Sequence, residues 1–286
     1  ERFVGAYYDG DIAIDWRAYK LTASGSFPTN IKNQTYHFYK AEGTSYYCTD
    51  IDIPQSQTIA TNTTWENVSI TNKITIEDGA ILAINGLIGC SDVDNLVIKE
   101  GGQLIHNNAG VKATLEKEIE GYGSTNESWY TISSPLMGNV ALSDVEGLIP
   151  SNNDYDLYRY DEPTSVWQNV KQSSNNFTNL ENGRGYLYAN EYDATLSFAG
   201  ELNGDDVTYH LSKTENIALS GFHLIGNPFT HNIYKGVGAA IDDNNLAAGY
   251  YTLSNAGAWG AKISDDIPIA PGQGILVKTS KEGDVK

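Results

Sequence analysis

The sequence has few basic residues. Lysine and arginine together number 18 against 36 aspartate and glutamate residues, so the formal net charge is −18. A field of this sign repels phosphate backbones and opposes binding to anionic lipid. No apolar run approaches the ~20 residues that a membrane-spanning helix needs. We therefore expect no nucleic-acid partner and no insertion into a membrane.

Cysteine is also scarce, because the chain contains only Cys48 and Cys90. No Cys-x-x-Cys pair or Cys/His cluster is present, so a structural zinc site is not expected. The two cysteines fit either of two interpretations. They could form one disulfide in an oxidising compartment, or they could be two small buried side chains. The sequence leaves both alternatives open.

Common catalytic motifs are missing as well. Two Gly-x-Gly elements, 183–185 and 272–274, lack the Lys-Ser/Thr and the following helix of a phosphate-binding loop. No Gly-x-Ser-x-Gly turn surrounds Ser133 or Ser134, so a serine nucleophile is not indicated. The glycines are predicted to form tight turns before buried strands. We therefore expect that the chain is not an enzyme.

Long segments with helical periodicity are absent, and the residues present favour strands. The chain has 19 tyrosines and 28 glycines among its 286 residues. Most segments alternate apolar and polar residues over short runs separated by Gly and Asn turns, which is typical of half-buried strands. This pattern predicts an all-β protein. Residues 1–54 contain several strand-like runs without a repeat and are predicted to be a β segment of unknown type.

A short repeat follows in residues 55–120. Segment 74–85 aligns with segment 96–107 at an offset of 22 residues, which places Ile74 opposite Leu96. A fixed period of this length is typical of solenoids, in which each turn buries its aliphatic side chains by stacking on the next. The repeat predicts a short parallel β-helix of about three 22-residue rungs.

A longer repeat occupies residues 121–286. Trp129–Pro135 matches Phe222–Pro228 at an offset of 93 residues, and the two Gly-x-Gly elements follow at an offset of 89. Trp167 and Trp259 match at an offset of 92. These blocks predict two homologous units, at about 129–200 and 222–286, that form a duplicated, jelly-roll-like β-sandwich.

Two further expectations follow from the longer repeat. Positions that recur in both units are more often shared core than ligand contacts, so Trp167 and Trp259 are predicted to be core residues. The strand expected at 194–198 would have its counterpart near residue 283, close to the last residue of the sequence. We therefore expect the second unit to be incomplete and the natural protein to continue.

Candidate binding residues come from loops and from tyrosines outside the repeats. Calcium takes six to eight oxygen ligands, so acidic loops are the candidate calcium site, with plain solvated loops as the alternative. The candidate metal ligands are Asp9, Asp11, Asp15, Asp242 and Asp243. The candidate ligand contacts are Tyr7, Tyr8, Tyr46 and Tyr47.

Four strings of the sequence carry a resemblance to a known group. They are Ile74–Leu82, Gly101–Asn108, Trp129–Pro135 and Gly226–Phe229. Together they resemble the C-terminal stalk regions of large secreted proteins of Bacteroidetes, over about residues 55–286. Such proteins often end in a sorting domain of the type IX secretion system. The resemblance implies structural modules at an extracellular or cell-surface location, and it carries over no catalytic residue.

These observations lead to one expected function and one alternative. The expected function is a non-catalytic secreted or cell-surface module with a structural or adhesive role. Its partner would be a glycan or a host surface protein, and calcium is the single cofactor considered. The alternative is a carbohydrate-binding accessory module of a glycan-degrading enzyme. That alternative requires two or three exposed, coplanar aromatic rings on one face.

Overall fold

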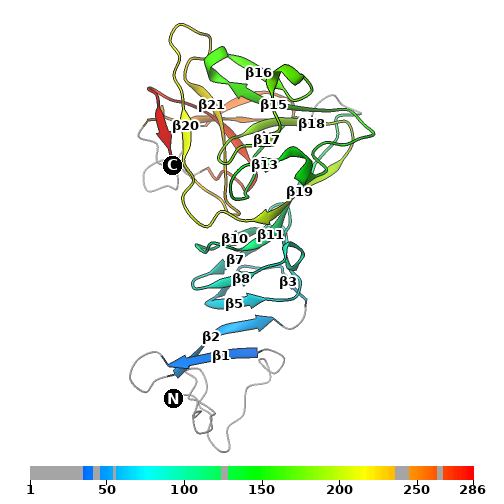
Figure 1. Cartoon of the computed structure of the whole chain (residues 1–286), viewed down its shortest axis with the longest axis vertical. Helices are drawn as coiled ribbons and strands as arrows, with labels where there is room; N and C mark the ends of the chain where they lie inside the picture. Colours follow the sequence, from blue (N-terminus) through cyan, green and yellow to red (C-terminus); the bar gives the residue numbers. More distant parts are fainter. Residues whose placement is uncertain (1–34, 41–45, 54–55, 124–127, 236–244, 263–266) are drawn as a thin grey trace, which may run out of the picture.

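The computed structural model describes residues 35–40, 46–53, 56–123, 128–235, 245–262 and 267–286. Every regular element in these ranges is a β-strand or a short 3-10 turn, so the prediction of an all-β protein is confirmed. Figure 1 shows a column of short strands beneath a larger body, with β11 and β19 at the boundary.

The column, which we call the parallel stack, contains three sheets that the chain visits in a fixed order. Parallel pairing links β2 to β5 to β8, β3 to β6 to β9, and β4 to β7 to β10. A further strand, β1 (Thr35–Lys40), pairs antiparallel with β2. The stack strands are β2 (Tyr46–Ile53), β3 (Gln57–Ile59), β4 (Thr63–Trp65), β5 (Asn67–Ile70), β6 (Ile74–Ile76), β7 (Ile81–Ile84), β8 (Ile88–Cys90), β9 (Leu96–Ile98) and β10 (Gln103–Ile105).

The residues that align in the short repeat are direct neighbours in space. Ile74 pairs with Leu96, and Leu82 pairs with Leu104, each at the 22-residue offset. All four side chains are fully buried, because each turn covers the apolar face of the next. The offset is shorter in other turns, down to 17 residues between Gln57 and Ile74. The 22-residue spacing therefore describes one turn, and loops of different length make up the others.

One sheet runs from the parallel stack into the body. Strand β11 (Lys112–Ile119) pairs in parallel with β9 on one side and antiparallel with β19 (Ala194–Glu201) on the other. The resulting six-stranded sheet has the order β14-β19-β11-β9-β6-β3, with β14 at Val145–Glu146. A single cluster of buried apolar residues extends from Ile59 to Leu202. Stack and body therefore share a sheet and a core.

The body contains two four-stranded antiparallel sheets of the same strand order. The first has the order β12-β18-β15-β16 and the second β21-β24-β22-β23, so corresponding strands occupy corresponding places. A pair of outer strands, β20 (Tyr209–Leu211) and β25 (Gly283–Val285), matches β11 and β19 of the first unit. The strands of the two sheets are β12 (Tyr130–Ile132), β15 (Tyr155–Asp161), β16 (Val166–Asn169), β18 (Tyr186–Asn190), β21 (Phe222–Gly226), β22 (Tyr250–Leu253), β23 (Trp259–Lys262) and β24 (Gly274–Lys278). The expectation that the second unit lacks its closing strand is wrong, because the three residues of β25 pair with β20 where the repeat places that strand.

The two sheets contact each other through repeated positions. The amide of Gly226 donates to the carbonyl of Gly183, and the amide of Ser133 donates to the carbonyl of Gly272, each at 3.0 Å. Gly226 and Ser133 are equivalent in the repeat, so these two bonds are reciprocal. A Cβ placed on Gly274 would lie 3.4 Å from the Cα of Gly185. The first glycine of each Gly-x-Gly element has a positive φ, in agreement with the predicted tight turns, and the second permits close packing of the two backbones.

The second unit also closes the top of the parallel stack. Leu104 donates its amide to the carbonyl of Thr230 at 2.9 Å, and the Thr230 hydroxyl donates back to Leu104 at 2.8 Å. Nearby, His106 is only 6% exposed. Its Nδ1 accepts the amide of Asn108 at 3.2 Å, while its Nε2 has no hydrogen-bond partner within the described part of the chain. Burial, assisted by His231, lowers the pKa of His106 to about 4.

His106 should make stability fall in mild acid. The unfolded chain takes up a proton near the ordinary pKa of about 6.5, whereas the folded protein resists protonation until about 4. Stability is therefore full above that ordinary pKa and declines as the pH falls towards 4. We expect the wild type to lose about 2 kcal/mol between about pH 7 and about pH 5, measured by urea unfolding. His106→Gln should lose clearly less than the wild type over this interval. An equal loss in His106→Gln would exclude His106 as the cause.

Candidate functional site

An aromatic pocket is lined by residues of both body sheets. Its volume is about 290 Å³. It is lined by Tyr160, Trp167, Leu219, Phe222, Tyr251, Trp259 and Leu276. Five of these seven side chains are aromatic. Concave apolar pockets between packed elements are where small molecules usually bind, so this pocket is the leading candidate site.

The two repeated tryptophans form part of this pocket, so their prediction as core residues is wrong. Both Trp167 and Trp259 are only half-buried. The reason is their position in the sheets, since β16 and β23 are the outermost strands of their respective sheets. A side chain on an edge strand has no further strand beside it. Each indole therefore lines the open cavity rather than a closed core.

The rings in the pocket are tilted towards one another. Tyr160 and Trp167 have centroids 5.0 Å apart and an interplanar angle of 54°. Phe222 and Tyr251 have centroids 6.2 Å apart and an angle of 45°. The Lys278 ammonium lies 5.2 Å from the centroid of the Phe222 ring. These measured pairs form inclined walls rather than a flat platform.

The lining offers little for acid–base chemistry. No described lining residue carries a carboxylate, an amide, an imidazole or an amine. The Tyr160 hydroxyl already shares a hydrogen bond of 3.2 Å with the hydroxyl of Ser165. The pocket can bind a ligand by apolar and aromatic contact, and the hydroxyls of Tyr160 and Tyr251 are the titratable groups of its described lining.

A buried carboxylate holds one wall of the aromatic pocket in place. Glu162 is 1% exposed and accepts hydrogen bonds from Ser212, from both the amide and the hydroxyl of Thr214, and from the Gly221 amide, at 2.8–3.0 Å. Burial alone would raise the pKa of Glu162, but these bonds outweigh it and lower the pKa to about 2. The segment fixed in this way carries Leu219, which is half exposed at the rim.

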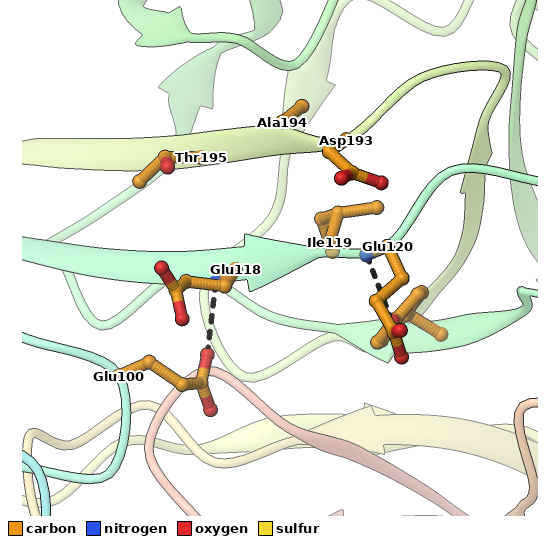
Figure 2. Close-up of a pocket in the computed structure, with 8 residues that line it drawn as sticks. Glu100, Glu118, Ile119, Glu120, Asp193, Ala194 and Thr195 are labelled. Carbon is orange, nitrogen blue, oxygen red and sulfur yellow. Dashed lines mark hydrogen bonds between the residues drawn. The ribbon is translucent and has the colours of Figure 1, made fainter.

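A second hollow, at the boundary between stack and body, is acidic. Figure 2 shows carboxylates of Glu100, Glu118, Glu120 and Asp193 around an open cavity of about 610 Å³. Glu100 accepts the amide of Glu118 at 3.0 Å, and Lys117 lies 3.4 Å from Glu100. The other three acidic residues are exposed to solvent. No group of three or more His, Cys, Asp or Glu side chains able to hold a metal ion occurs among the residues that the structure describes.

The candidate residues from the sequence mostly fall outside the described part of the chain. Strand β2 contains Tyr46 and Tyr47, whose side chains are outside the description. The residues wholly outside it are Tyr7, Tyr8, Asp9, Asp11, Asp15, Asp242 and Asp243. A calcium site in the acidic loops and a ligand role for these tyrosines therefore stay predictions.

The observed strand register does not bring Cys48 and Cys90 together. Cys90 pairs with Ile70, which pairs with Ile53 on β2, two strands away. Cys48 lies five residues before Ile53, so the two Cα atoms are separated by about 10 Å across the sheet and about 16 Å along it. A disulfide spans at most about 7 Å between Cα atoms. Cys90 is a buried free thiol that donates to the carbonyl of Asp92 at 3.3 Å.

Comparisons with protein-family models, with curated proteins and with solved structures found no match to this chain. Within the described ranges, no helix is long and apolar enough to cross a membrane.

Proposed function

We propose that this chain is a non-catalytic structural and adhesive module of a secreted or cell-surface protein. The observation that supports this proposal is the sheet shared by the two parts. Because β11 is hydrogen-bonded to β9 and to β19, the parallel stack supports the body without an intervening linker. Such an arrangement suits a support that presents a binding surface at a fixed orientation. The surface presented would include the aromatic pocket.

We further infer that the parallel stack is a short β-helix that begins at β2, before the boundary at residue 55 that the sequence predicts, and that residues 121–286 hold a duplicated, jelly-roll-like β-sandwich. The first inference is supported by the three parallel ladders and the fixed order in which the chain visits them. The second is supported by the matching strand order and by the reciprocal bonds of Gly226 and Ser133. The equivalent turns of the two units also form the same kind of hydrogen bond. Ser134 accepts the amide of Leu136 at 3.2 Å, and Asn227 accepts the amide of Phe229 at 2.9 Å.

A carbohydrate-binding accessory module is the second candidate, and the five aromatic rings of the pocket favour it. The geometry supports it less well than the adhesive role. The C–H face of a sugar stacks best on coplanar rings, and its hydroxyls are best bound by amide or carboxylate groups, whereas the measured ring pairs are tilted and the described lining lacks such groups.

The structural proposal predicts that damage in the stack is transmitted to the body. Ile98 is fully buried and pairs with Ile76 below and with Leu115 of β11 above. Ile98→Ala should cost about 2–4 kcal/mol and should raise amide exchange in body strand β18 as well as in the stack, measured by hydrogen–deuterium exchange. Ile105→Ala, at a site 39% exposed, is the matched control and should change little. Faster exchange confined to the stack would contradict the proposal.

The adhesive proposal is tested by binding to an array of glycans and extracellular-matrix proteins, with calcium and with chelator. We expect specific binding to at least one of them and no cleavage of any glycan. Loss of binding in chelator would support calcium in the acidic loops. Absence of binding across the array would refute the adhesive role, and release of glycan products would refute the non-catalytic assignment.

A further inference from the structure

We propose that the aromatic pocket binds a small soluble organic cation through its alkylated ammonium group, as in a quaternary ammonium compound. This inference goes beyond the proposed function and does not depend on the location of the protein. It rests on the aromatic lining of the cavity, the inclination of the rings and the charge of the chain.

The pocket walls match the chemistry of a cation without strong hydration. An aromatic face carries negative potential, and a cation within about 6 Å of a ring centroid is attracted to it. Phe222 already takes part in such a contact, because the Lys278 ammonium lies 5.2 Å from its centroid. The net charge of −18 also favours a positive ligand over a negative one.

The tilt of the rings distinguishes a compact cation from a flat ligand. One C–H face of a pyranose chair stacks best on aromatic rings that are coplanar, but the two measured pairs are inclined by 54° and 45°. A rounded alkylammonium group can contact inclined walls on several sides at once. Its alkyl groups need no hydrogen-bond partner, which agrees with a lining that has no charged or amide side chain.

Lys278 is expected to weaken the binding of a cation. Its ammonium lies beside the Phe222 wall and carries the same charge as the proposed ligand. A bound cation is therefore repelled by Lys278 and competes with it for the ring. Removal of this charge in Lys278→Met should tighten cation binding severalfold, whereas it would leave a neutral ligand almost unaffected.

The experiment titrates the full chain with tetramethylammonium and with choline, using calorimetry and tryptophan fluorescence. The neutral control is the carbon analogue of choline, in which a quaternary carbon replaces the nitrogen. We expect the cations to bind at least about tenfold more tightly than this analogue. Equal binding of the analogue would show a merely apolar pocket and would overturn the proposal. Tighter binding of neutral hexoses than of either cation would also overturn it, as would binding to phosphatidylcholine vesicles without binding of the free cations.

Variants place the binding in the pocket. Trp259→Ala should reduce cation affinity at least about tenfold, and Trp259→Phe, which keeps a ring, should retain part of it. Tyr192→Ala is the matched control, because Tyr192 is 60% exposed and does not line the pocket. Circular dichroism checks that each variant is folded, and Lys278→Met provides a gain of affinity that misfolding cannot imitate. Unchanged cation affinity in folded Trp259→Ala would overturn the proposal.

Discussion

Replacement of Glu162 by alanine is expected to lower the free energy of unfolding by about 3–5 kcal/mol. The substitution removes the one acceptor of four hydrogen bonds from Ser212, Thr214 and Gly221 in a site that is 1% exposed. Buried donors without an acceptor cost about 1–3 kcal/mol each, and water entering the vacated space recovers part of this. Urea unfolding at neutral pH measures the loss.

Two further variants test whether the lost hydrogen bonds cause the fall in stability. Glu162→Gln should lose less, because the amide oxygen can still accept two of the bonds while its NH₂ group faces the remaining donors. Glu146→Ala, at an exposed position of β14, should stay within about 0.5 kcal/mol of the wild type. A loss below about 1 kcal/mol in Glu162→Ala would mean that the four bonds do not hold the segment of residues 212–221.

The charge of Glu162 adds a pH dependence of its own. The pKa of this carboxyl is lowered from 4.5 to about 2, so its stabilising effect is full above 4.5 and is lost as the pH falls towards 2. This interval lies below the one expected for His106, whose effect is spread between about 6.5 and 4. Stability measured from neutral to strongly acidic pH should therefore decline in two stages, and Glu162→Gln should weaken the lower stage alone.

Replacement of Gly226 by alanine is expected to cost about 3 kcal/mol or more. A Cβ on Gly226 would lie 2.2 Å from the Cβ of Ser133 and 2.8 Å from the carbonyl oxygen of Arg184. Neither neighbour can move freely, because Ser133 is fully buried and its hydroxyl donates to the carbonyl of Asn227 at 2.8 Å. Overpacking of this kind forces backbone shifts, which thermal or urea unfolding would register as lost stability.

A double-mutant cycle isolates the contact between residues 226 and 133. Gly226→Ala should cost less in a Ser133→Gly background, because that background removes the Cβ that the new methyl group meets. Gly89→Ala is the control, since a Cβ at Gly89 has nothing within 4 Å, and it should be nearly neutral. An equal cost of Gly226→Ala in both backgrounds would show that Ser133 is not the obstacle.

The contact of Gly226 with Ser133 also explains a difference within the repeat. The two residues occupy equivalent positions of the two units, and they meet where the two sheets touch. Only one of them can carry a Cβ in that space, so one unit has serine and the other has glycine. The same reasoning applies to Gly185 and Gly274, which approach so closely that both positions are glycine.

Much of the fold could be predicted from the sequence, because residues that repeat become neighbours. Ile74 and Leu96 align in the sequence and pair in the sheet, since each aliphatic side chain is buried by its copy in the next turn. The length of the other turns could not be predicted in this way. It depends on loops whose residues face solvent, so the number of residues per turn varies between 17 and 22.

The candidate site was far less predictable. Whether a repeated tryptophan belongs to the core or to a pocket wall depends on whether its strand lies inside a sheet or at its edge. Local periodicity in the sequence does not predict the order of strands in a sheet. Glu162 precedes a proline in what reads as an ordinary surface turn, and its four donors come from a segment about 50 residues later. The repetition of tryptophan at 167 and 259 in weakly apolar strands was the one available signal for the pocket.

Because its strands pair in parallel, the stack can change in length by small, regular steps. Each additional turn would lift the body by one inter-strand spacing, about 4.8 Å, and would use 17 to 22 residues to do so. The same residues in a fully extended linker could reach about 12 to 16 times further, but with no fixed direction. The length of the parallel stack can therefore change in steps of one turn, while the sheet shared with the body fixes how the body is joined to the stack.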